Sequence, residues 1–301
     1  MMTSGLLYVD KPAGMTSHDV VSVVRRAVRS KRVGHAGTLD PFATGLLVMA
    51  VNAATRLLPY VVGEPKVYDA VIRFGYETNT DDHTGEVTRE ANSPVADLLA
   101  QPDAPPLRDA IAALTGQLAQ VPPAFSAKHV NGERAYALAR RGAVVDLAPV
   151  LVNVMHWGWL ASSPDSLSVR ITCGGGTYIR ALARDLGRAL GSAAHCERLR
   201  RVSSGAAHVA DAEPLERLEP GSVIDGRVVL RSPLSALGAI AHEPLDEAGI
   251  AALRFGRRVA ATTAGPRGAL LWNDTVVAIA ERAVGDWWQP RVVMLGEEAA
   301  E

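Results

Sequence analysis

A single carboxylate, Asp40, lies in a segment of the chain that is dense in glycine and proline. The segment is Gly34-His35-Ala36-Gly37-Thr38-Leu39-Asp40-Pro41-Phe42-Ala43-Thr44-Gly45-Leu46-Leu47. Its glycines allow positive φ or a close backbone approach, and Pro41 biases Asp40 towards extended or turn backbone. Because the apolar residues 46–51 follow at the length of a strand, we expect this loop to be pinned against a buried element. The loop could present its acid to a substrate, although an Asp before Pro is also a common turn initiator without any chemistry.

A second candidate for chemistry is the stretch Cys173-Gly174-Gly175-Gly176-Thr177-Tyr178-Ile179-Arg180, where a glycine turn joins an expected strand to an expected helix. This arrangement is typical of a phosphate cradle, but no Gly-Lys-Ser/Thr follows, so the Walker pattern is absent. Along the helix, Arg180, Arg184 and Arg188 recur every fourth residue and form one cationic row. For Arg184 and Arg188 we expect a solvated row.

Periodicity predicts the elements that must position these residues. In residues 67–74, the alternation predicts a strand with Tyr68, Ala70, Ile72 and Phe74 on its inward face. Other expected strands are 5–9, 150–160 and 167–172. One expected helix is capped by Ser17, and three more cover residues 107–118, 135–141 and 179–190.

The connecting segments are polar or rich in proline. Residues 80–86 lack the spacing of an EF-hand, so we interpret them as a polar hairpin turn rather than a metal loop, and residues 91–106 as a surface linker. The sequence Arg231-Ser232-Pro233 indicates a domain joint. Short strand-like runs follow at 253–259, 269–272, 276–280 and 292–294, with Asn273-Asp274 as a hairpin turn, and we expect residues 297–301 to be a disordered tail.

Composition limits the classes of function. The 301 residues, 48% of them hydrophobic, suffice for one large or two smaller domains, and the net charge of −1 means that any RNA-binding charge must be local. Cys173 and Cys196 have no Cys-x-x-Cys spacing, which favours core residues over a disulfide or a zinc site. The sequence has no signal peptide pattern and no window of membrane-spanning length, so we expect a cytoplasmic protein. No long apolar stripe or coiled-coil pattern is present, and we therefore expect a monomer.

The Asp40 segment closely resembles the signature of the TruB family of tRNA pseudouridine synthases, in which the Asp is catalytic. Two further stretches, Lys66-Val67-Tyr68 and Gly176-Thr177-Tyr178-Ile179-Arg180, match the family in the same order. The resemblance covers roughly residues 5 to 205. It implies an α+β fold, with a catalytic domain built on a central mixed, mainly antiparallel sheet flanked by helices.

The same resemblance suggests how the domains divide. Together with the joint at Arg231-Ser232-Pro233, it gives a catalytic domain at 1–229, and the region 230–296 is similar to the small β-barrel RNA-binding modules of the PUA type. Within the catalytic domain, the segment Pro122-Pro123 to Tyr136 matches a family insert that closes over the RNA stem-loop, here at about 121–145. Lys128 and Arg134 are candidate RNA contacts in this insert. Four cations, Lys128, Arg134, Arg140 and Arg141, stand against Glu133 alone, so the segment could also be simply a solvated basic loop.

The resemblance assigns roles residue by residue. It implies that Asp40 is the catalytic acid, that Arg180 pairs with it, and that Tyr68 lies against the target base, where a base can stack on its ring. The assigned substrate contacts are His35, Tyr178 and Leu199, with His35 occupying space that the flipped base leaves. One departure is Gly175, where some relatives have Lys, which puts a phosphate contact in doubt.

The implied reaction is isomerisation of the uridine at position 55 in the tRNA T loop, with no cofactor and no metal. A stacked base must first be flipped out, and an ionised Asp40 could then act as a nucleophile at C1′ of the ribose or at C6 of uracil. The base that removes the C5 proton is not identified, with Tyr68 and Asp40 as candidates. Two alternatives stay open: a tRNA-binding or tRNA-folding module in which catalysis is secondary, and a phosphate-ester or nucleotide enzyme that uses the Gly174–Gly176 turn.

Overall fold

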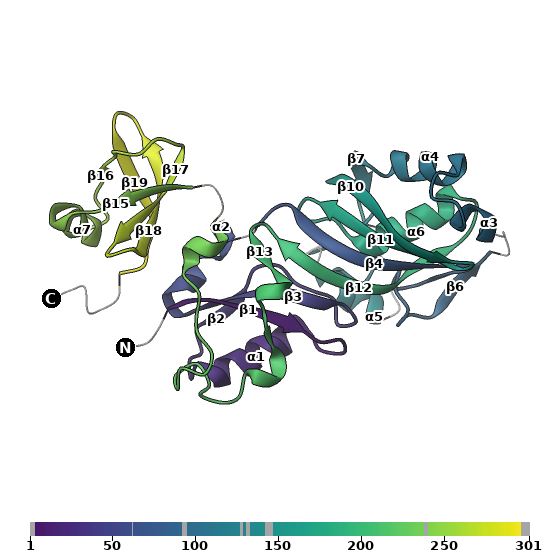
Figure 1. Cartoon of the computed structure of the whole chain (residues 1–301), viewed down its shortest axis with the longest axis horizontal. Helices are drawn as coiled ribbons and strands as arrows, with labels where there is room; N and C mark the ends of the chain where they lie inside the picture. Colours follow the sequence, from purple (N-terminus) through teal and green to yellow (C-terminus); the bar gives the residue numbers. More distant parts are fainter. Residues whose placement is uncertain are drawn as a thin grey trace. The chain divides into compact units, whose positions relative to one another are not determined.

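The computed structural model divides the chain into two compact units (Figure 1). The described residues are 4–61, 63–91, 95–126, 129–130, 133–141, 147–237 and 240–295. The terminal unit contains Met1–Pro41, Gly45–Gly63 and Ser204–Glu301, and the central unit contains Phe42–Thr44 and Glu64–Ser203. The predicted boundary near residue 230 and the predicted tail stay predictions, and residues 297–301 lie outside the described part of the chain.

In the terminal unit, a small mixed sheet carries one long helix. Strand β1 (Gly5–Lys11) pairs antiparallel with β3 (Thr44–Val51), β2 (Val33–His35) pairs antiparallel with β3, and β14 (Glu213–Pro214) pairs parallel with β1. Helix α1 (Ser17–Ala27) buries the predicted apolar stripe. The stripe packs in one apolar cluster with side chains of β1 and β3. The cluster includes Val20, Val21 and Val24 of the helix, Leu7 and Val9 of β1, and Leu47 and Met49 of β3. The strands predicted at 5–9 and 46–51 are confirmed.

The predicted cap of α1 is wrong by one residue. Thr16 is the N-cap, and its side chain accepts from the Asp19 backbone amide while the Asp19 carboxylate accepts from the Thr16 amide. This reciprocal pair satisfies two amides that would otherwise have no partner in the first turn. Ser17 is instead buried and is free to make a contact elsewhere in the fold.

Short elements follow in the same unit. They are η1 (Asn52–Leu57), α2 (Leu58–Val61), β13 (Ala207–His208), η2 (Val209–Asp211), η3 (Leu215–Arg217) and η4 (Pro233–Ala236). The Tyr8 and Ser235 hydroxyls lie 2.9 Å apart, within hydrogen-bond distance. No helix among the described residues is both long enough and apolar enough to cross a membrane.

The C-terminal part of this unit forms a sheet of its own, in the order β15-β17-β18-β19-β16. The elements are β15 (Ala241–Pro244), α7 (Glu247–Arg254), β16 (Val259–Ala260), β17 (Arg267–Trp272), β18 (Thr275–Ala283) and β19 (Trp287–Val293). The predicted turn at Asn273-Asp274 is confirmed, with φ of 49° and 58° at the two residues. The strand-like run predicted at 253–259 is wrong over most of its length, because Asp246 caps a helix that continues to Arg254.

A buried carboxylate, Glu243, fastens this sheet. It accepts hydrogen bonds from the backbone amides and hydroxyls of Thr262 and Thr263 and from Trp288 Nε1, at 2.6–2.9 Å. Burial by itself would raise the pKa of Glu243, but these hydrogen bonds outweigh burial and lower the pKa from 4.5 to about 2. The ionised carboxylate is therefore a structural group that joins β15 to the loop after β16 and to β19.

In the central unit, a larger sheet has the order β12-β4-β11-β10-β7. Its strands are β4 (Lys66–Phe74), β7 (Gly116–Gln120), β10 (Val150–Ser163), β11 (Ser166–Cys173) and β12 (Ala194–Ser204). The pairs β4–β11, β11–β10 and β10–β7 are antiparallel. Burial alternates along β4 as predicted, so that Tyr68, Ala70, Ile72 and Phe74 share the buried face.

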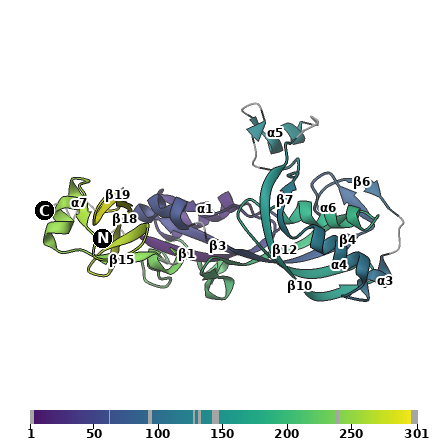
Figure 2. The ribbon, with the colours of Figure 1, turned by 90° about the horizontal axis from the view of Figure 1, so that it is seen from above.

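The helices of this unit are α3 (Ala96–Leu99), α4 (Pro105–Ala113), α5 (Ala135–Arg140) and α6 (Ile179–Ala189). The helix predicted at 107–118 ends early, because residues 116–120 pair with β10 as β7. The predicted linker 91–106 contains α3, whose Leu99 is buried. Figure 2 shows α5 projecting away from the sheet, and β8 (His129–Val130) pairs with β9 (Glu133–Arg134) before it.

A hairpin leaves the end of β4. Strand β5 (Tyr76–Thr78) pairs antiparallel with β6 (Val87–Glu90), and residues 79–86 form the turn between them. The predicted polar turn is thus confirmed. Among the described residues, no group of three or more His, Cys, Asp or Glu side chains could hold a metal ion.

We predict that Glu243→Gln weakens the protein in a pH-dependent way. Since the folded pKa is below the unfolded value, the ionised group contributes about 3 kcal/mol above pH 4.5, and this contribution is lost as the pH falls towards 2. Chemical denaturation at pH 7 and pH 3 measures the difference between variant and wild type. Glu281→Gln is the control, because Glu281 is a partly exposed carboxylate in the same sheet. A gap between Glu243→Gln and wild type that is equal at both pH values would contradict the prediction.

Candidate active site

The loop that carries Asp40 is fastened on both sides of the acid. On one side, Ser17 Oγ accepts from the Leu39 amide at 2.9 Å and donates to the Leu39 carbonyl at 3.1 Å. On the other side, the Pro41 carbonyl accepts from the Gly14 amide at 2.8 Å. Asp40 itself is partly exposed. A carboxylate between two fixed backbone positions is held in place without being buried.

A buried lysine completes this scaffold. Lys11, at the end of β1, is fully buried, and its Nζ donates to the carbonyls of Pro12, Met15 and Pro41 at 2.7–3.2 Å. These carbonyls surround the ammonium group, which can make three hydrogen bonds. Because Pro41 directly follows Asp40, Lys11 ties the Asp40 loop to the turn after β1. Nothing in the sequence indicated that Lys11 and Ser17 hold the Asp40 loop.

The glycines predicted to shape this loop do so. Gly37 and Gly45 have φ of 93° and 98°, in the region that side chains disfavour. His35 lies on β2 in register with Met49, and its ring is edge-on to the ring of His18, with centroids 6.4 Å apart. His35 and Asp40 thus come from one continuous stretch of the terminal unit, a strand and the loop after it.

The other predicted site residues belong to the central unit. Tyr68 is almost fully buried on β4, in register with Ile171 of β11. Leu199 is buried on β12, and its carbonyl accepts from Thr44 Oγ1 at 3.5 Å. Phe42, two residues after Asp40 in the sequence, also belongs to this unit. Its ring lies edge-on to the ring of His83, with the ring centroids 5.5 Å apart.

The glycine turn before α6 is not arranged as a phosphate cradle. The Gly175 amide donates to Glu64 Oε1 at 2.7 Å, so a carboxylate occupies the donor that a phosphate would need. A Cβ at Gly175 would lie 2.5 Å from the same oxygen. Thr177 Oγ1 donates to the Gly174 carbonyl at 3.0 Å and closes the turn from within. Because this turn is not arranged to bind a phosphate, it no longer supports the alternative of a phosphate-ester or nucleotide enzyme.

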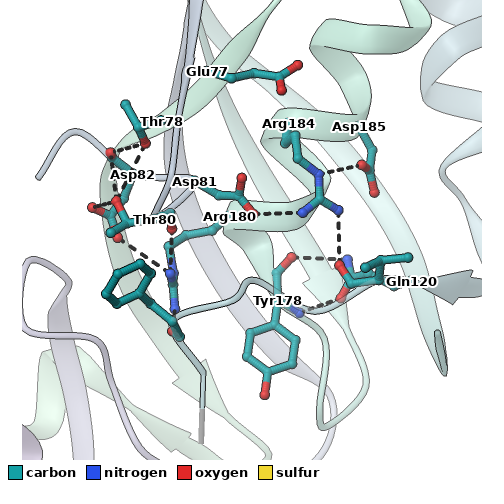
Figure 3. Close-up of polar contacts among 12 residues, drawn as sticks. Glu77, Thr78, Thr80, Asp81, Asp82, Gln120, Tyr178, Arg180, Arg184 and Asp185 are labelled. Atoms are coloured by element: carbon teal, nitrogen blue, oxygen red, sulfur yellow. Dashed lines mark hydrogen bonds and ion pairs between the residues drawn. The ribbon is translucent and has the colours of Figure 1, made fainter. Parts of the chain in front are cut away.

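Tyr178 is the N-cap residue of α6, and its backbone is hydrogen-bonded to the side chain of Gln120. Gln120, buried at the end of β7, accepts from the Tyr178 amide at 2.8 Å and donates to the Tyr178 carbonyl at 3.1 Å (Figure 3). Both hydrogen-bonding groups of one side-chain amide are therefore used on a single residue. Nothing in the sequence around Gln120 indicated this contact.

Arg180, in the first turn of α6, is 3% exposed. Its Nη1 donates to the Thr80 carbonyl at 2.6 Å and lies 3.6 Å from Asp82 Oδ2, while Nη2 donates to the Phe125 carbonyl at 3.0 Å (Figure 3). A buried guanidinium is stable only when it is paired and hydrogen-bonded, and the hairpin turn supplies part of that environment.

The predicted solvated row is wrong for Arg184. This side chain is buried and pairs with Asp81 and Asp185, at 2.7 Å and 2.9 Å. Arg188 is half exposed, but it also donates twice to the buried Glu77, at 2.6 Å and 2.9 Å. The periodicity of the row was correct, whereas Asp81 and Glu77 lie 103 and 111 positions before the arginines that they cover and could not be matched to them from the sequence.

Two predicted RNA contacts fall in the insert. Lys128 lies outside the described residues, and Arg134 ends the short strand β9, where only its backbone is described.

Comparison with known proteins decides the family. A family model described as TruB family pseudouridylate synthase (N terminal domain) matches residues 25–179, more than half of the chain. The chain belongs to the TruB family. It is therefore a pseudouridine synthase, an enzyme that isomerises uridine to pseudouridine.

Similar proteins cover nearly the whole TruB chain. The tRNA pseudouridine synthase B of Arthrobacter sp. (strain FB24) is 45% identical over 266 residues, which are 86% of this chain and 83% of that protein. The protein of the same name from Solibacter usitatus (strain Ellin6076) is 39% identical over 297 residues, covering 96% of this chain and 99% of that protein.

Solved structures support the fold. A chain in the crystal structure of the archaeal box H/ACA sRNP Nop10-Cbf5 complex matches with a TM-score of 0.71 and 20% identity, and covers 100% of this chain and 89% of that chain. A chain in an H/ACA RNP bound to a substrate RNA containing 2′-deoxyuridine also gives a TM-score of 0.71 and covers 98% and 86%. Together with the strands and helices described above, these matches confirm the predicted α+β fold with a mixed sheet.

We predict that Ser17→Ala loosens the Asp40 loop. The change leaves the buried amide of Leu39 without its side-chain acceptor, which costs about 1–3 kcal/mol of unfolding free energy, and it should slow pseudouridine formation. Thermal unfolding and a single-turnover assay measure the two effects. Ser22→Ala is the control on the same helix, because the Ser22 hydroxyl donates to the carbonyl of His18, an exposed residue of that helix. Equal stability and rate for both variants would show that Ser17 does not hold the loop.

Proposed function

We propose that this TruB-family enzyme isomerises the uridine at position 55 in the T loop of tRNA, with Asp40 as the nucleophile. The observation that carries the proposal is the complete Gly34–Leu47 motif, with its acid, in a chain that belongs to the family. The names of the relatives, tRNA pseudouridine synthase B, support tRNA as the substrate. The enzyme works as a cytoplasmic monomer and needs no cofactor.

The reaction starts with attack by the Asp40 carboxylate at C1′ of the ribose or at C6 of the uracil. The bond between N1 and C1′ breaks, the base rotates, and C5 bonds to C1′ in place of N1. The bond that Asp40 formed breaks in turn: C5 displaces the carboxylate if Asp40 attacked C1′, and the adduct eliminates the carboxylate if Asp40 attacked C6. The proton on C5 then leaves to a base, for which Tyr68 and Asp40 are the candidates, and N1 gains a proton. The loop contacts of Ser17, Gly14 and Lys11 support this role, because a catalytic group must be held within about 0.5 Å of its productive position.

The base must leave its stack before Asp40 can reach it, which costs a few kcal/mol. Tyr68 recovers part of this cost by stacking on the flipped base, and His35 fills space that the base vacates. Tyr178 and Leu199 contact the base or its sugar, and Arg180 supplies the cation that Asp40 requires. Lys128 and Arg134 contact the RNA from the insert. The family motifs support each of these assignments at the matching residue.

The C-terminal sheet is a PUA-like RNA-binding domain in this proposal, at about 230–296. Phe255 is 75% exposed, the Arg257 guanidinium lies over its ring at 5.3 Å from the ring centroid, and Trp287 is also exposed. Exposed aromatic rings beside arginines are the surface that unpaired bases and phosphates prefer. The exposed pair of Phe255 and Arg257 supports the assignment of RNA binding to the domain.

We predict that the purified enzyme forms pseudouridine at one position of an unmodified tRNA transcript. Chemical mapping by primer extension should give a single new stop at position 55, and none in a matched transcript with cytidine at that position. An isolated T stem-loop should also be modified, because the flipped base and its stem make the proposed contacts. Pseudouridine at another position only, or in neither transcript, would contradict the proposed substrate.

A further inference from the structure

The start of the insert is tied to the first half of α6 by buried polar side chains. We call Gln120–Ser126 the insert root. Within the central unit, three side chains connect it to α6: Gln120 itself, Arg180 and Arg184 (Figure 3). These are separate contacts, and each uses a different atom of the insert root.

Arg180 and Arg184 fix the insert root at two carbonyls. Arg180 Nη2 donates to the Phe125 carbonyl, and Arg184 Nη2 donates to the Val121 carbonyl, both at 3.0 Å. The two arginines lie one helical turn apart, and the two carbonyls lie four residues apart in the insert root. Because two carbonyls of the insert root are held, the direction of this segment along α6 is fixed as well as its distance from the helix.

Arg184 connects this pair of elements to a third. Its Nη1 donates to Asp81 in the hairpin turn at 2.7 Å, and its Nε donates to Asp185 on α6 at 2.9 Å. Asp81 is itself fixed, because its amide donates to the Thr78 carbonyl and its carbonyl accepts from the Cys196 amide. One guanidinium therefore joins helix, hairpin turn and insert root.

Gln120 completes the connection at the residue before α6. Its amide group bonds to both the amide and the carbonyl of Tyr178, as a neighbouring strand would do. Since Gln120 ends β7 and starts the insert root, any shift of that root is passed to the backbone of Tyr178. Two residues later comes Arg180, so this contact links the insert root to the stretch that carries both proposed site residues.

We propose that Arg184 and Gln120 are positioning residues for the isomerisation. They hold the insert root and the hairpin turn in a fixed register with α6, and thereby set the orientation of Tyr178 and Arg180. This inference rests on the proposed function. A lysine at position 184 would keep the charge but lacks the planar fork that serves three acceptors in three directions. Displacement of a positioned group by about 1 Å can cost up to about 100-fold in rate.

Arg188 offers a matched comparison. It is the next residue of the same row, one turn further along α6, and it also pairs with a buried acid of the hairpin. In the described part of the chain, its side chain donates to Glu77 and not to the insert root. Arg188→Lys therefore weakens a charge pair of the same kind without touching the segment that Arg184 positions.

The experiment compares Arg184→Lys with Arg188→Lys in the full-length enzyme. The single-turnover rate of pseudouridine formation at saturating unmodified tRNA and the Kd for the same tRNA are measured together, with thermal unfolding as the check on folding. We expect Arg184→Lys to lower the rate by about 10-fold to 100-fold. Its Kd should stay close to the wild-type value, and Arg188→Lys should keep the wild-type rate.

A second variant covers the case in which Arg184→Lys does not fold. Gln120→Met keeps the length of the side chain but removes both hydrogen bonds to Tyr178, and it should show the same loss of rate with affinity retained. Equal rates for Arg184→Lys and Arg188→Lys, or a wild-type rate for Gln120→Met, would overturn the inference. If wild type itself forms no pseudouridine in tRNA, the proposed function fails instead, so the two failures are distinguishable.

Discussion

The central unit depends on the neutralisation of buried guanidinium groups on α6. Arg180 and Arg184 are almost completely removed from water, and a charge in that position is tolerated only with opposite charges and hydrogen-bond acceptors around it. The hairpin turn supplies Asp81 and Asp82, and the insert root supplies two backbone carbonyls. Removal of either arginine would leave an acid buried without its partner. The hairpin turn and the insert root therefore have little freedom to move away from the helix.

Burial raises the pKa of Asp81 to about 6, against the opposing effect of Arg184 and Arg180. The direction of this shift shows that water is largely excluded from the Asp81 carboxylate.

The Asp40 loop is held in a different way. Its contacts are hydrogen bonds to backbone groups on both sides of the acid, from the Ser17 hydroxyl, the Gly14 amide and the Lys11 ammonium. These contacts fix the backbone and leave the carboxylate partly exposed. A proposed nucleophile needs this combination, because it must be both positioned and accessible to the substrate. The two units therefore position their proposed site residues differently. Buried charge pairs support the proposed binding residues, and hydrogen bonds to the backbone on both sides of Asp40 support the proposed nucleophile.

Local patterns predicted the strands better than the polar contacts. The alternation in residues 66–74 predicted β4 and its buried face, because one side of the sheet is packed and the period of a strand is two. The helix predicted over 107–118 ended early because Gly116, with φ of 87°, leaves the helical region and residues 116–120 pair with β10. Ser17 looked like a cap, yet Thr16 and Asp19 form the capping box and free Ser17 for Leu39. Gln120 lies 58 positions from Tyr178, and Arg184 lies 63 and 103 positions from Val121 and Asp81, so these roles had no local signal. The family motif therefore carried the assignment of Asp40, while the supporting contacts required the fold.

The central claim is that Asp40 performs the chemistry, and the most direct test compares wild type with Asp40→Asn on unmodified tRNA. Asparagine keeps the size and most hydrogen bonds of the side chain but is not a nucleophile of comparable strength. Pseudouridine is scored by chemical mapping under single-turnover conditions, and tRNA affinity is measured in parallel. The account predicts that Asp40→Asn binds tRNA as wild type does and forms no detectable pseudouridine. Pseudouridine formation by Asp40→Asn at a rate near that of wild type would contradict it.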